Sequence, residues 1–520
     1  MSAPSLLSSG LSSTLSGGLG EHNHAPHGGP LAGEQFDETN PLLPSASAVI
    51  PPLPYQAALQ NARLLMRMTP LPVMQLACLC ALHLVEPMVM GQISPSVNAM
   101  LADFRPALPE VGEDMPASAG PLSGIFDSAF STMQLFAVHQ LVRISDKIGR
   151  RPIMLWSVAG MAMSSFLFGF SRSVPVAVLI SCITSLSSAN MAVVTSMLGE
   201  ITDSSNQAIA FSVFGFAEPL GNTVGAFIGT TFSNPAATYP RVCDNFFFRA
   251  FPNFLSGILT AGVAFACMNF AYHFMNEVRH NRSIITHGII ALLSAPHLRA
   301  VCLSGLALSF IATAHDTAFA LLSTAPIETG GLAFSTADAE YCLVLAGGLA
   351  SLLQLLVLPL LLARHGHARV HSACAALWPW CFALLPLANA AAWLGLPDEA
   401  GDRRDAPRGL EHVHPRARAV VWGGVVAMIA LAKSARMAFS INMILVKERA
   451  PNAASLGAAN GLSQSGMALA QAAASAFVNA LAALSLGHEG ARQYLWIVGL
   501  VIISFVGLWS AKDVERGVED

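Results

Sequence analysis

The stretch Arg143–Pro152 reads RISDKIGRRP and lies between two long apolar runs. It holds four basic residues and one acid, although the whole chain is only 11% charged and 53% hydrophobic. About a quarter of the residues of a soluble domain are charged, so a chain of 520 residues with so few charges could not cover a water-facing surface. We therefore expect most of the chain to lie in lipid, with this stretch at the membrane surface.

On either side of this stretch, apolar runs recur at about the 20-residue length that a membrane helix needs. Six runs precede a more polar segment at 276–297 and six follow it. The runs are 72–95, 121–142, 153–171, 174–198, 207–232, 252–275, 298–322, 341–363, 370–395, 418–446, 454–486 and 492–511. They are too long for barrel strands, and a helix satisfies its own backbone hydrogen bonds in lipid. We predict an all-α membrane protein with twelve transmembrane helices in two six-helix halves.

The predicted domain organisation follows from these runs. It comprises a disordered cytosolic N-terminal tail at 1–69, an N-terminal half at 70–275, a cytosolic middle loop at 276–297, a C-terminal half at 298–512 and a cytosolic C-terminal tail at 513–520. With both termini in the cytosol, the short inner loops carry about twice as many Lys and Arg residues as the outer loops, apart from the mixed-charge loop at 397–418. This excess predicts the orientation.

The N-terminal tail carries the pattern Glu38-x-x-x-Leu42-Leu43, which has the spacing of an adaptor-read dileucine sorting signal. A chance match explains so short a pattern equally well. If the signal is real, a sorting adaptor is a partner and a vacuolar membrane is favoured over the plasma membrane. The net charge of −4 argues against nucleic acid as a partner. The scattered cysteines suggest no disulfide framework, metal site or other cofactor, and we expect a monomer in the lipid bilayer.

The order of residues within Arg143–Pro152 suggests a specific contact at the membrane surface. Asp146 can accept hydrogen bonds from an arginine or from a helix N-terminus. Gly149 permits a sharp turn, and Pro152 suits the first turn of the third helix. Arg150 and Arg151 can pair with acids or lipid phosphates. A loop that makes charge contacts in only one conformation can act as a latch, although a basic loop is also what the orientation rule alone requires.

The stretch resembles the cytosolic signature loop of the major facilitator superfamily, usually Gly-x-Leu-x-Asp-Arg-x-Gly-Arg-Arg/Lys. Asp146, Gly149, Arg150 and Arg151 match, Lys147 takes the place of the first arginine, and Val142 replaces the leading glycine. Further segments are similar to the fungal and plant zinc-induced-facilitator-like and tetracycline-resistance-like branch, of drug:H⁺ antiporter type. They are Leu84–Met88, Met197–Gln207, Phe232–Pro240, Thr324–Leu332 and Leu456–Leu462.

This resemblance implies a secondary transporter that works by alternating access, exports a small molecule and exchanges it for protons. It implies no enzymatic activity, and the chain holds no HExxH, GxSxG or P-loop motif. A rival hypothesis is a membrane sensor derived from a transporter, or a uniporter without proton coupling. That hypothesis rests on Val142 and on the segment Ser181–Ser185, which lacks the arginine that many such antiporters carry in helix four.

Ionisable side chains inside the predicted spans are costly and are candidates for coupling or substrate binding. Glu86 is the first candidate, and Asp316 the second. The others are Asp127, Glu218, Lys433, Arg436 and the polar residue Asn190. Each charge has an alternative role in a structural ion pair, such as an acid of the N-terminal half against Lys433 or Arg436. Asp127 can also be a hydrated residue near the outer surface. Glycines at 221, 225 and 229 share one helix face and predict a close helix contact.

Overall fold

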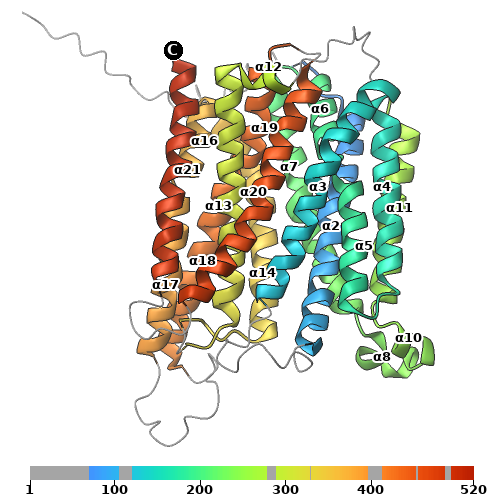
Figure 1. Cartoon of the computed structure of the whole chain (residues 1–520), viewed down its shortest axis with the longest axis vertical. Coiled ribbons are helices and arrows are strands. Elements are labelled where there is room, and N and C mark those ends of the chain that lie inside the picture. The colour runs from blue at the N-terminus through green and yellow to red at the C-terminus, as the bar shows by residue number, and fades with distance from the viewer. Residues whose placement is uncertain are drawn as a thin grey trace, which may run out of the picture. The chain divides into compact units, whose positions relative to one another are not determined.

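The computed structural model describes residues 69–104, 120–277, 289–327, 330–395, 413–452, 455–485 and 494–519, which belong to one compact unit. Helices and connecting turns make up these ranges, and no β-strand occurs in them (Figure 1). Most of the predicted tail at 1–69, with Glu38, Leu42 and Leu43, lies outside the described residues.

The long helices of the N-terminal half lie side by side, and α5 and α6 follow one another as two shorter helices (Figure 1). They are α2 (Val73–Phe104), α3 (Gly120–Ile148), α4 (Arg150–Phe168), α5 (Val174–Ser188), α6 (Met191–Ile201), α7 (Gln207–Phe232) and α11 (Phe254–Phe274). The three short helices α8 (Pro235–Thr238), α9 (Pro240–Cys243) and α10 (Phe246–Ala250) connect α7 to α11.

The C-terminal half contains a second set of long helices, several of which are interrupted. They are α13 (Pro296–Thr324), α14 (Thr336–Leu352) with η3 (Leu353–Val357) and α15 (Leu358–Arg364), α16 (His367–Ala375), α17 (Trp378–Leu394), α18 (Pro415–Arg436), α19 (Ala438–Arg449), α20 (Leu456–Ser485) and α21 (Leu495–Glu519), preceded by the short α12 (Ile289–Leu293). Each interruption is a π-helical turn or a short non-helical link that divides one predicted run into consecutive helices.

The predicted all-α class is confirmed, and each predicted run coincides with one helix or with two or three consecutive helical segments. Within the described ranges, nine helical segments are long and apolar enough to cross a membrane. The other three runs coincide with α3, α4 and α7, where glycine, hydroxyl or polar residues lower the hydropathy. Large apolar side chains such as Trp156, Phe136 and Trp509 point outward, as expected of a surface that faces lipid.

Some boundaries differ from the sequence-based expectation. α3 continues to Ile148, so most of the predicted loop after 142 is helical and only Gly149 separates α3 from α4. The run at 174–198 divides into α5 and α6 at Ala189 and Asn190. α21 extends to Glu519, so the boundary predicted at 512 lies inside this helix. Helical hydrogen bonding continues past the apolar residues because charged side chains on a helix can be solvated at the membrane surface.

The closest helix contact in the N-terminal half joins α2 to α7, as the glycine spacing predicted. A Cβ atom on Gly221 would lie 2.4 Å from Leu84 O, one on Gly225 2.0 Å from Met88 O, and one on Gly229 2.6 Å from Gln92 O. Three successive carbonyls on one face of α2 therefore rest directly on the backbone of α7. Small residues allow such close packing in lipid, where the hydrophobic effect does not drive helices together.

We expect Gly225→Ala to destabilise the protein by about 1–3 kcal/mol, because a methyl group would overlap Met88 O and push α2 from α7. Gly262→Ala in α11 is the matched control, since nothing lies within 4 Å of its added Cβ. The apparent melting temperature of the purified protein is the measurement. Equal melting temperatures for the two variants would contradict the proposed backbone contact.

The two groups of helices meet along two main seams. α3 packs against α20, and α7 packs against α14. Within the N-terminal group, α4 packs against α11 and α5; within the C-terminal group, α13 packs against α20 and α21. The ionisable residues predicted to be functional lie on α2, α3, α7, α13 and α18, and of these helices α3 and α7 belong to the seams.

Candidate substrate and coupling site

An arginine from the C-terminal half lies between carboxylates from both halves. The Arg436 guanidinium, at the end of α18, donates through Nη2 to Asp316 Oδ2 on α13. Its Nη1 atom lies 3.9 Å from Glu218 Oε1 on α7. The side chains of Asp316 and Glu218 are 54% and 48% exposed. This triad therefore links the halves without being sealed from its surroundings.

Two neighbours extend this triad in the C-terminal half. Lys433, one helical turn before Arg436, is close enough to interact electrostatically with Arg436, Asp316 and Glu218. His315 Nδ1 lies 3.8 Å from Asp316 Oδ1. The buried imidazole packs at a tilt against Trp378 and Phe382, and neither of its nitrogens has a hydrogen-bond partner among the described residues. The group therefore contains charges of both signs, and each of its two cations, Lys433 and Arg436, interacts with both carboxylates.

Glu86 lies on α2 in a smaller polar group within the N-terminal half. Its Oε1 atom accepts a hydrogen bond of 3.0 Å from Gln134 Nε2 on α3. The same amide nitrogen donates to Ser188 Oγ at the end of α5, at 3.2 Å. The Glu218 carboxylate is near enough to repel Glu86 electrostatically. Glu86 therefore has polar neighbours, and no ion pair joins it to a cation among the described residues.

The structure brings most of the predicted site residues into two neighbouring groups. Glu218, Asp316, Lys433 and Arg436 form one, and Glu86 interacts with it through Glu218. Asn190 lies apart from them in the break between α5 and α6, where its Nδ2 atom is buried without a hydrogen-bond partner among the described residues. The side chain of Asp127 lies outside the described residues. The ion-pair alternative is realised for Glu218 and Arg436.

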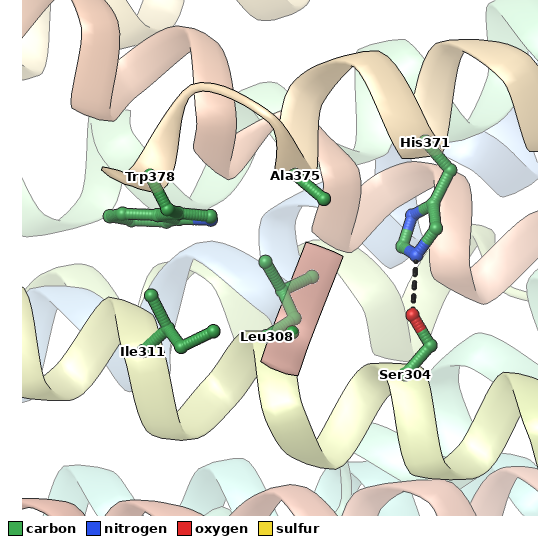
Figure 2. Close-up of a pocket in the computed structure, with 7 residues that line it drawn as sticks. Ser304, Leu308, Ile311, His371, Ala375 and Trp378 are labelled. Carbon is green, nitrogen blue, oxygen red and sulfur yellow. Dashed lines mark hydrogen bonds between the residues drawn. The ribbon is translucent and has the colours of Figure 1, made fainter. Parts of the chain in front are cut away.

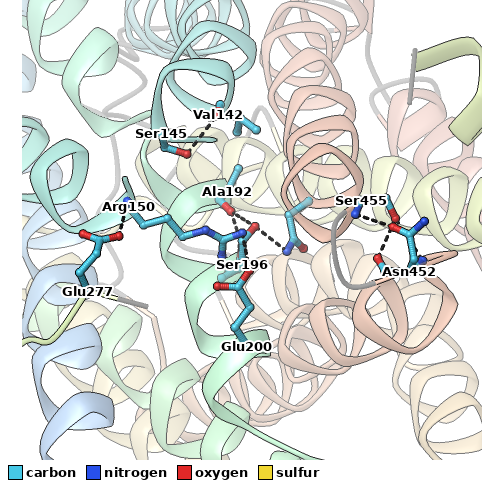
Figure 3. Close-up of polar contacts among 11 residues, drawn as sticks. Val142, Ser145, Arg150, Ala192, Ser196, Glu200, Glu277, Asn452 and Ser455 are labelled. Carbon is cyan, nitrogen blue, oxygen red and sulfur yellow. Dashed lines mark hydrogen bonds and ion pairs between the residues drawn. The ribbon is translucent and has the colours of Figure 1, made fainter. Parts of the chain in front are cut away.

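The stretch Arg143–Pro152 contains a one-residue turn at Gly149, and an acidic residue just beyond α11 binds the backbone that follows this turn. Gly149 has a φ of +117°, which glycine adopts without strain. Glu277, just beyond α11, accepts a hydrogen bond of 2.9 Å from the backbone nitrogen of Arg150 (Figure 3). It also accepts one of 3.0 Å from the backbone nitrogen of Arg151. A carboxylate at this place satisfies the free amides at the N-terminus of α4. The Arg151 guanidinium stacks over the ring of Tyr272.

The charged side chains of this turn reach across to other helices. Arg150 Nη2 lies 2.9 Å from Glu200 Oε1 near the end of α6, and these side chains are only 3% and 6% exposed (Figure 3). Asp146 stands over the start of α20, with Oδ1 3.2 Å from the place that a Cβ on Gly457 would take. Asp146 therefore lies beside the N-terminus of α20, which is the position that its predicted contact with a helix N-terminus requires. Lys147 is exposed.

The replacement of the family's glycine by Val142 is matched by a glycine on the opposite helix. Val142 is buried, and its Cγ2 methyl lies 3.2 Å from the place of a Cβ on Gly461 of α20. α3 and α20 can therefore approach closely even though the larger side chain is on α3. This complementarity removes one reason for the sensor hypothesis.

We expect Gly461→Val to destabilise the protein, because its side chain would overlap the methyl groups of Val142. The double variant Val142→Ala/Gly461→Val should recover stability, with an interaction energy of about 1 kcal/mol in the double-mutant cycle. Thermal unfolding of the wild type, the two single variants and the double variant measures this energy. Strictly additive effects would argue against direct packing of the two residues.

Polar contacts also join the two halves at the end of the bundle that carries this turn. Lys447 Nζ on α19 donates to Thr202 O at 2.7 Å and to Thr202 Oγ1 at 2.9 Å. Gln207 Nε2 donates to Glu448 Oε1 at 2.7 Å, and Asn460 Nδ2 donates to Ser196 Oγ at 2.9 Å. These bonds, made across the seam, hold the halves together at this end.

Two cavities lie in the C-terminal half. One, of about 450 Å³, opens beside the turn between α15 and α16 and is lined by Gly366, His367, Ala368, Arg369, Leu445, Glu448, Arg449 and Glu515. There His367 Nδ1 lies 2.8 Å from Glu448 Oε1. The other, of about 10 Å³, lies beside the 2.8 Å contact of His371 Nε2 with Ser304 Oγ and is lined mainly by apolar residues (Figure 2). It has room for about one water molecule.

Sequence reasoning did not single out Gln134, Ser188 or Glu277 as site residues. Gln134 and Ser188 are ordinary polar residues in apolar runs, and only the packing of α2, α3 and α5 shows that they meet Glu86. Glu277 offers a weak signal, since it is an acid directly after an apolar run.

Comparisons with known proteins agree on one family. A family model described as "Major Facilitator Superfamily" matches residues 88–400. The chain is 28% identical over 500 residues to "Major facilitator-type transporter psiT2" of Psilocybe cubensis, covering 88% of this chain and 92% of that protein. It is 26% identical to "Efflux pump azaK" of Aspergillus niger, covering 92% and 96%. The structure of the human organic anion transporter MFSD10 (TETRAN) matches with a TM-score of 0.62 at 16% identity, covering 85% of this chain and all of that one. The last match concerns the fold alone.

Proposed function

Since the chain belongs to the Major Facilitator Superfamily and is an integral multi-pass membrane transporter, we propose that it exports a small organic molecule in exchange for protons. Export is supported by the similarity to proteins named as an efflux pump and, over 29% of the chain, as a tetracycline resistance protein. The proposed partners are the substrate, protons and the bilayer, with a sorting adaptor if the tail carries a signal.

The observation that carries this proposal is the bridge of Arg436 between Asp316 and Glu218. Glu218 and Arg436 belong to different halves, so a relative movement of the halves changes their separation. Arg436 would remain with Asp316 in its own half, while Glu218 would become free to bind another cation or a proton. A central charge group with partners on both halves is what alternating access requires.

Glu86 is the proposed proton carrier. It interacts electrostatically with the bridge through Glu218 but is not itself part of the ion pair. Protonation of Glu86 would remove its repulsion with Glu218. The affinity of Glu86 for a proton would therefore depend on whether Arg436 lies close enough to Glu218 to neutralise it. This arrangement couples proton binding to the movement of the halves without a direct contact between Glu86 and the substrate.

The polar contacts of Lys447, Gln207 and Asn460 support a resting state that is closed at the end carrying Arg143–Pro152. We propose that this end faces the cytosol, together with both termini, and that the membrane is the vacuolar or the plasma membrane. In that orientation the described conformation would be closed to substrate entry from the cytosol. We propose that a monomer is sufficient, since both halves of the site come from one chain.

The test is proton flux in sealed vesicles that hold the purified protein under an imposed pH gradient. The panel should include small organic cations, organic anions and metal chelates. Proton movement that depends on one of these compounds supports exchange. Substrate movement that does not depend on the pH gradient would identify a uniporter and overturn the proton coupling. No flux with a folded, correctly oriented protein and a broad panel would favour the sensor hypothesis.

A further inference from the structure

The root of the N-terminal tail is fixed to the turn between α6 and α7. Thr69 Oγ1 donates a hydrogen bond to Asp203 Oδ2. Thr69 N donates to Ser205 Oγ at 3.2 Å, and Asn206 Nδ2 donates to Thr69 Oγ1 at 3.0 Å. Thr69 is nevertheless exposed. An exposed residue thus makes, through its hydroxyl group, a contact between segments more than 130 residues apart.

Asp203 is the centre of this contact. Its Oδ1 atom accepts from Ser205 Oγ at 2.6 Å, Ser205 N at 2.9 Å and Asn206 N at 3.2 Å. The hydrogen bonds from the hydroxyls of Ser205 and Thr69 lower the pKa of Asp203 to about 2. A carboxylate with a lowered pKa is protonated only when the pH falls towards that value, so Asp203 carries its full charge at neutral pH.

The same turn takes part in the contact between the halves. Thr202, directly before Asp203, accepts hydrogen bonds from Lys447 Nζ through both its carbonyl and its hydroxyl. The Lys447 ammonium group also interacts electrostatically with Asp203. The turn therefore connects the tail, through Thr69, to the seam that keeps this end of the bundle closed.

Thr69 is followed by Pro70, and a hydroxyl residue followed by proline is the acceptor that proline-directed protein kinases use. We propose that Thr69 is a phosphorylation site for such a kinase and that its modification releases the root of the tail from the turn at Asp203. In the reaction, Thr69 Oγ1 attacks the γ-phosphorus of ATP. The new O–P bond forms as the bond to the β,γ-bridging oxygen breaks, the hydroxyl proton passes to the kinase base, and ADP leaves.

Two physical effects make the modified state incompatible with the present contact. The phosphate group removes the proton that Thr69 donates to Asp203, and it places nearly two negative charges beside a carboxylate that stays ionised. Like charges at contact distance repel strongly. The proposal rests on the cytosolic placement of the tail proposed above, because both ATP and the kinase are cytosolic.

The test uses the full-length protein in lipid nanodiscs, a purified proline-directed kinase and ATP. Mass spectrometry should locate phosphate on Thr69 in the wild type and on the serine of Thr69→Ser. Thr69→Val should carry none at this position, and Pro70→Ala, which keeps the hydroxyl group, should carry much less. Lack of phosphate on wild-type Thr69, while a Thr-Pro peptide in the same reaction is modified, would overturn the proposal.

Hydrogen exchange then tests the release. Phosphorylation should make the amide of Thr69, which donates to Ser205 Oγ across this contact, exchange roughly tenfold faster or more, with no change in a control peptide from α13. In Asp203→Asn, where the repulsion is absent, phosphorylation should have a smaller effect. Unchanged exchange in the phosphorylated wild type would overturn the release. Neither readout uses transport, so a failure here is separate from a failure of the proposed export.

Discussion

Glu86→Gln is expected to abolish substrate-dependent proton movement in sealed vesicles while the protein stays folded. Glutamine has nearly the same shape, and its side-chain oxygen can still accept the hydrogen bond from Gln134 Nε2. It cannot take up or release a proton. We expect the coupled proton flux to fall by at least about a hundredfold, the lower end of what a positioned proton-transfer group contributes. A pH-sensitive dye inside the vesicles measures it.

Two matched variants show whether the loss is specific to the proton. Glu86→Asp keeps a titratable group and should retain part of the flux. Glu218→Gln weakens the contact with Arg436, whose nearest distance is already 3.9 Å, and should change substrate binding more than proton movement. If substrate flux and proton movement in Glu86→Gln both equal those of the wild type, Glu86 is not the carrier.

Arg150→Ala should cause the largest loss of stability among substitutions in the turn that joins α3 and α4. The arginine and its partner Glu200 are almost completely buried, at 3% and 6% exposure. Removal of one member of a buried ion pair leaves the other charge without compensation, at a cost of about 3–5 kcal/mol. We expect the apparent melting temperature of the purified protein to fall by several degrees.

The neutral double variant Arg150→Gln/Glu200→Gln separates the lost ion pair from the lost side-chain volume. It removes the charge imbalance and should recover much of the stability. Lys147→Ala is the surface control, because this exposed side chain should contribute less than about 0.5 kcal/mol. A melting temperature for Arg150→Ala equal to that of Lys147→Ala would show that the buried pair does not stabilise this end of the bundle.

The fold could be predicted from the sequence because apolar length is a strong signal. Every predicted run coincides with helical structure, and the glycines on one face of α7 predicted a close helix contact, whose partner the structure shows to be α2. Helix ends were less predictable. The segment 143–148 is polar enough to resemble a loop, yet it is the last part of α3, since a helix at the membrane surface can continue with charged residues.

The candidate site could be predicted only in part. A charged residue within an apolar run is costly in lipid and is therefore a candidate for function. This rule singled out Glu218, Asp316 and Arg436 one by one. Which of them meet depends on the rotation of α7, α13 and α18 about their axes, and no local pattern specifies that rotation. The contact of Val142 with Gly461 could not be predicted for the same reason. The valine that replaces the family's glycine on α3 is explained only by the glycine that faces it on α20.

The backbone contact between α2 and α7 has a consequence for the order of events during transport. Since the carbonyls of Leu84, Met88 and Gln92 rest on the glycines of α7, these helices cannot slide or rotate past each other without separating. In the proposed transport cycle, the backbones that carry Glu86 and Glu218 would therefore move together, and the repulsion between the two carboxylates would change little. The quantity that would vary is the distance of Glu218 from Arg436, so in the proposed mechanism the position of one guanidinium group would decide whether the repulsion is compensated by the arginine or relieved by a proton.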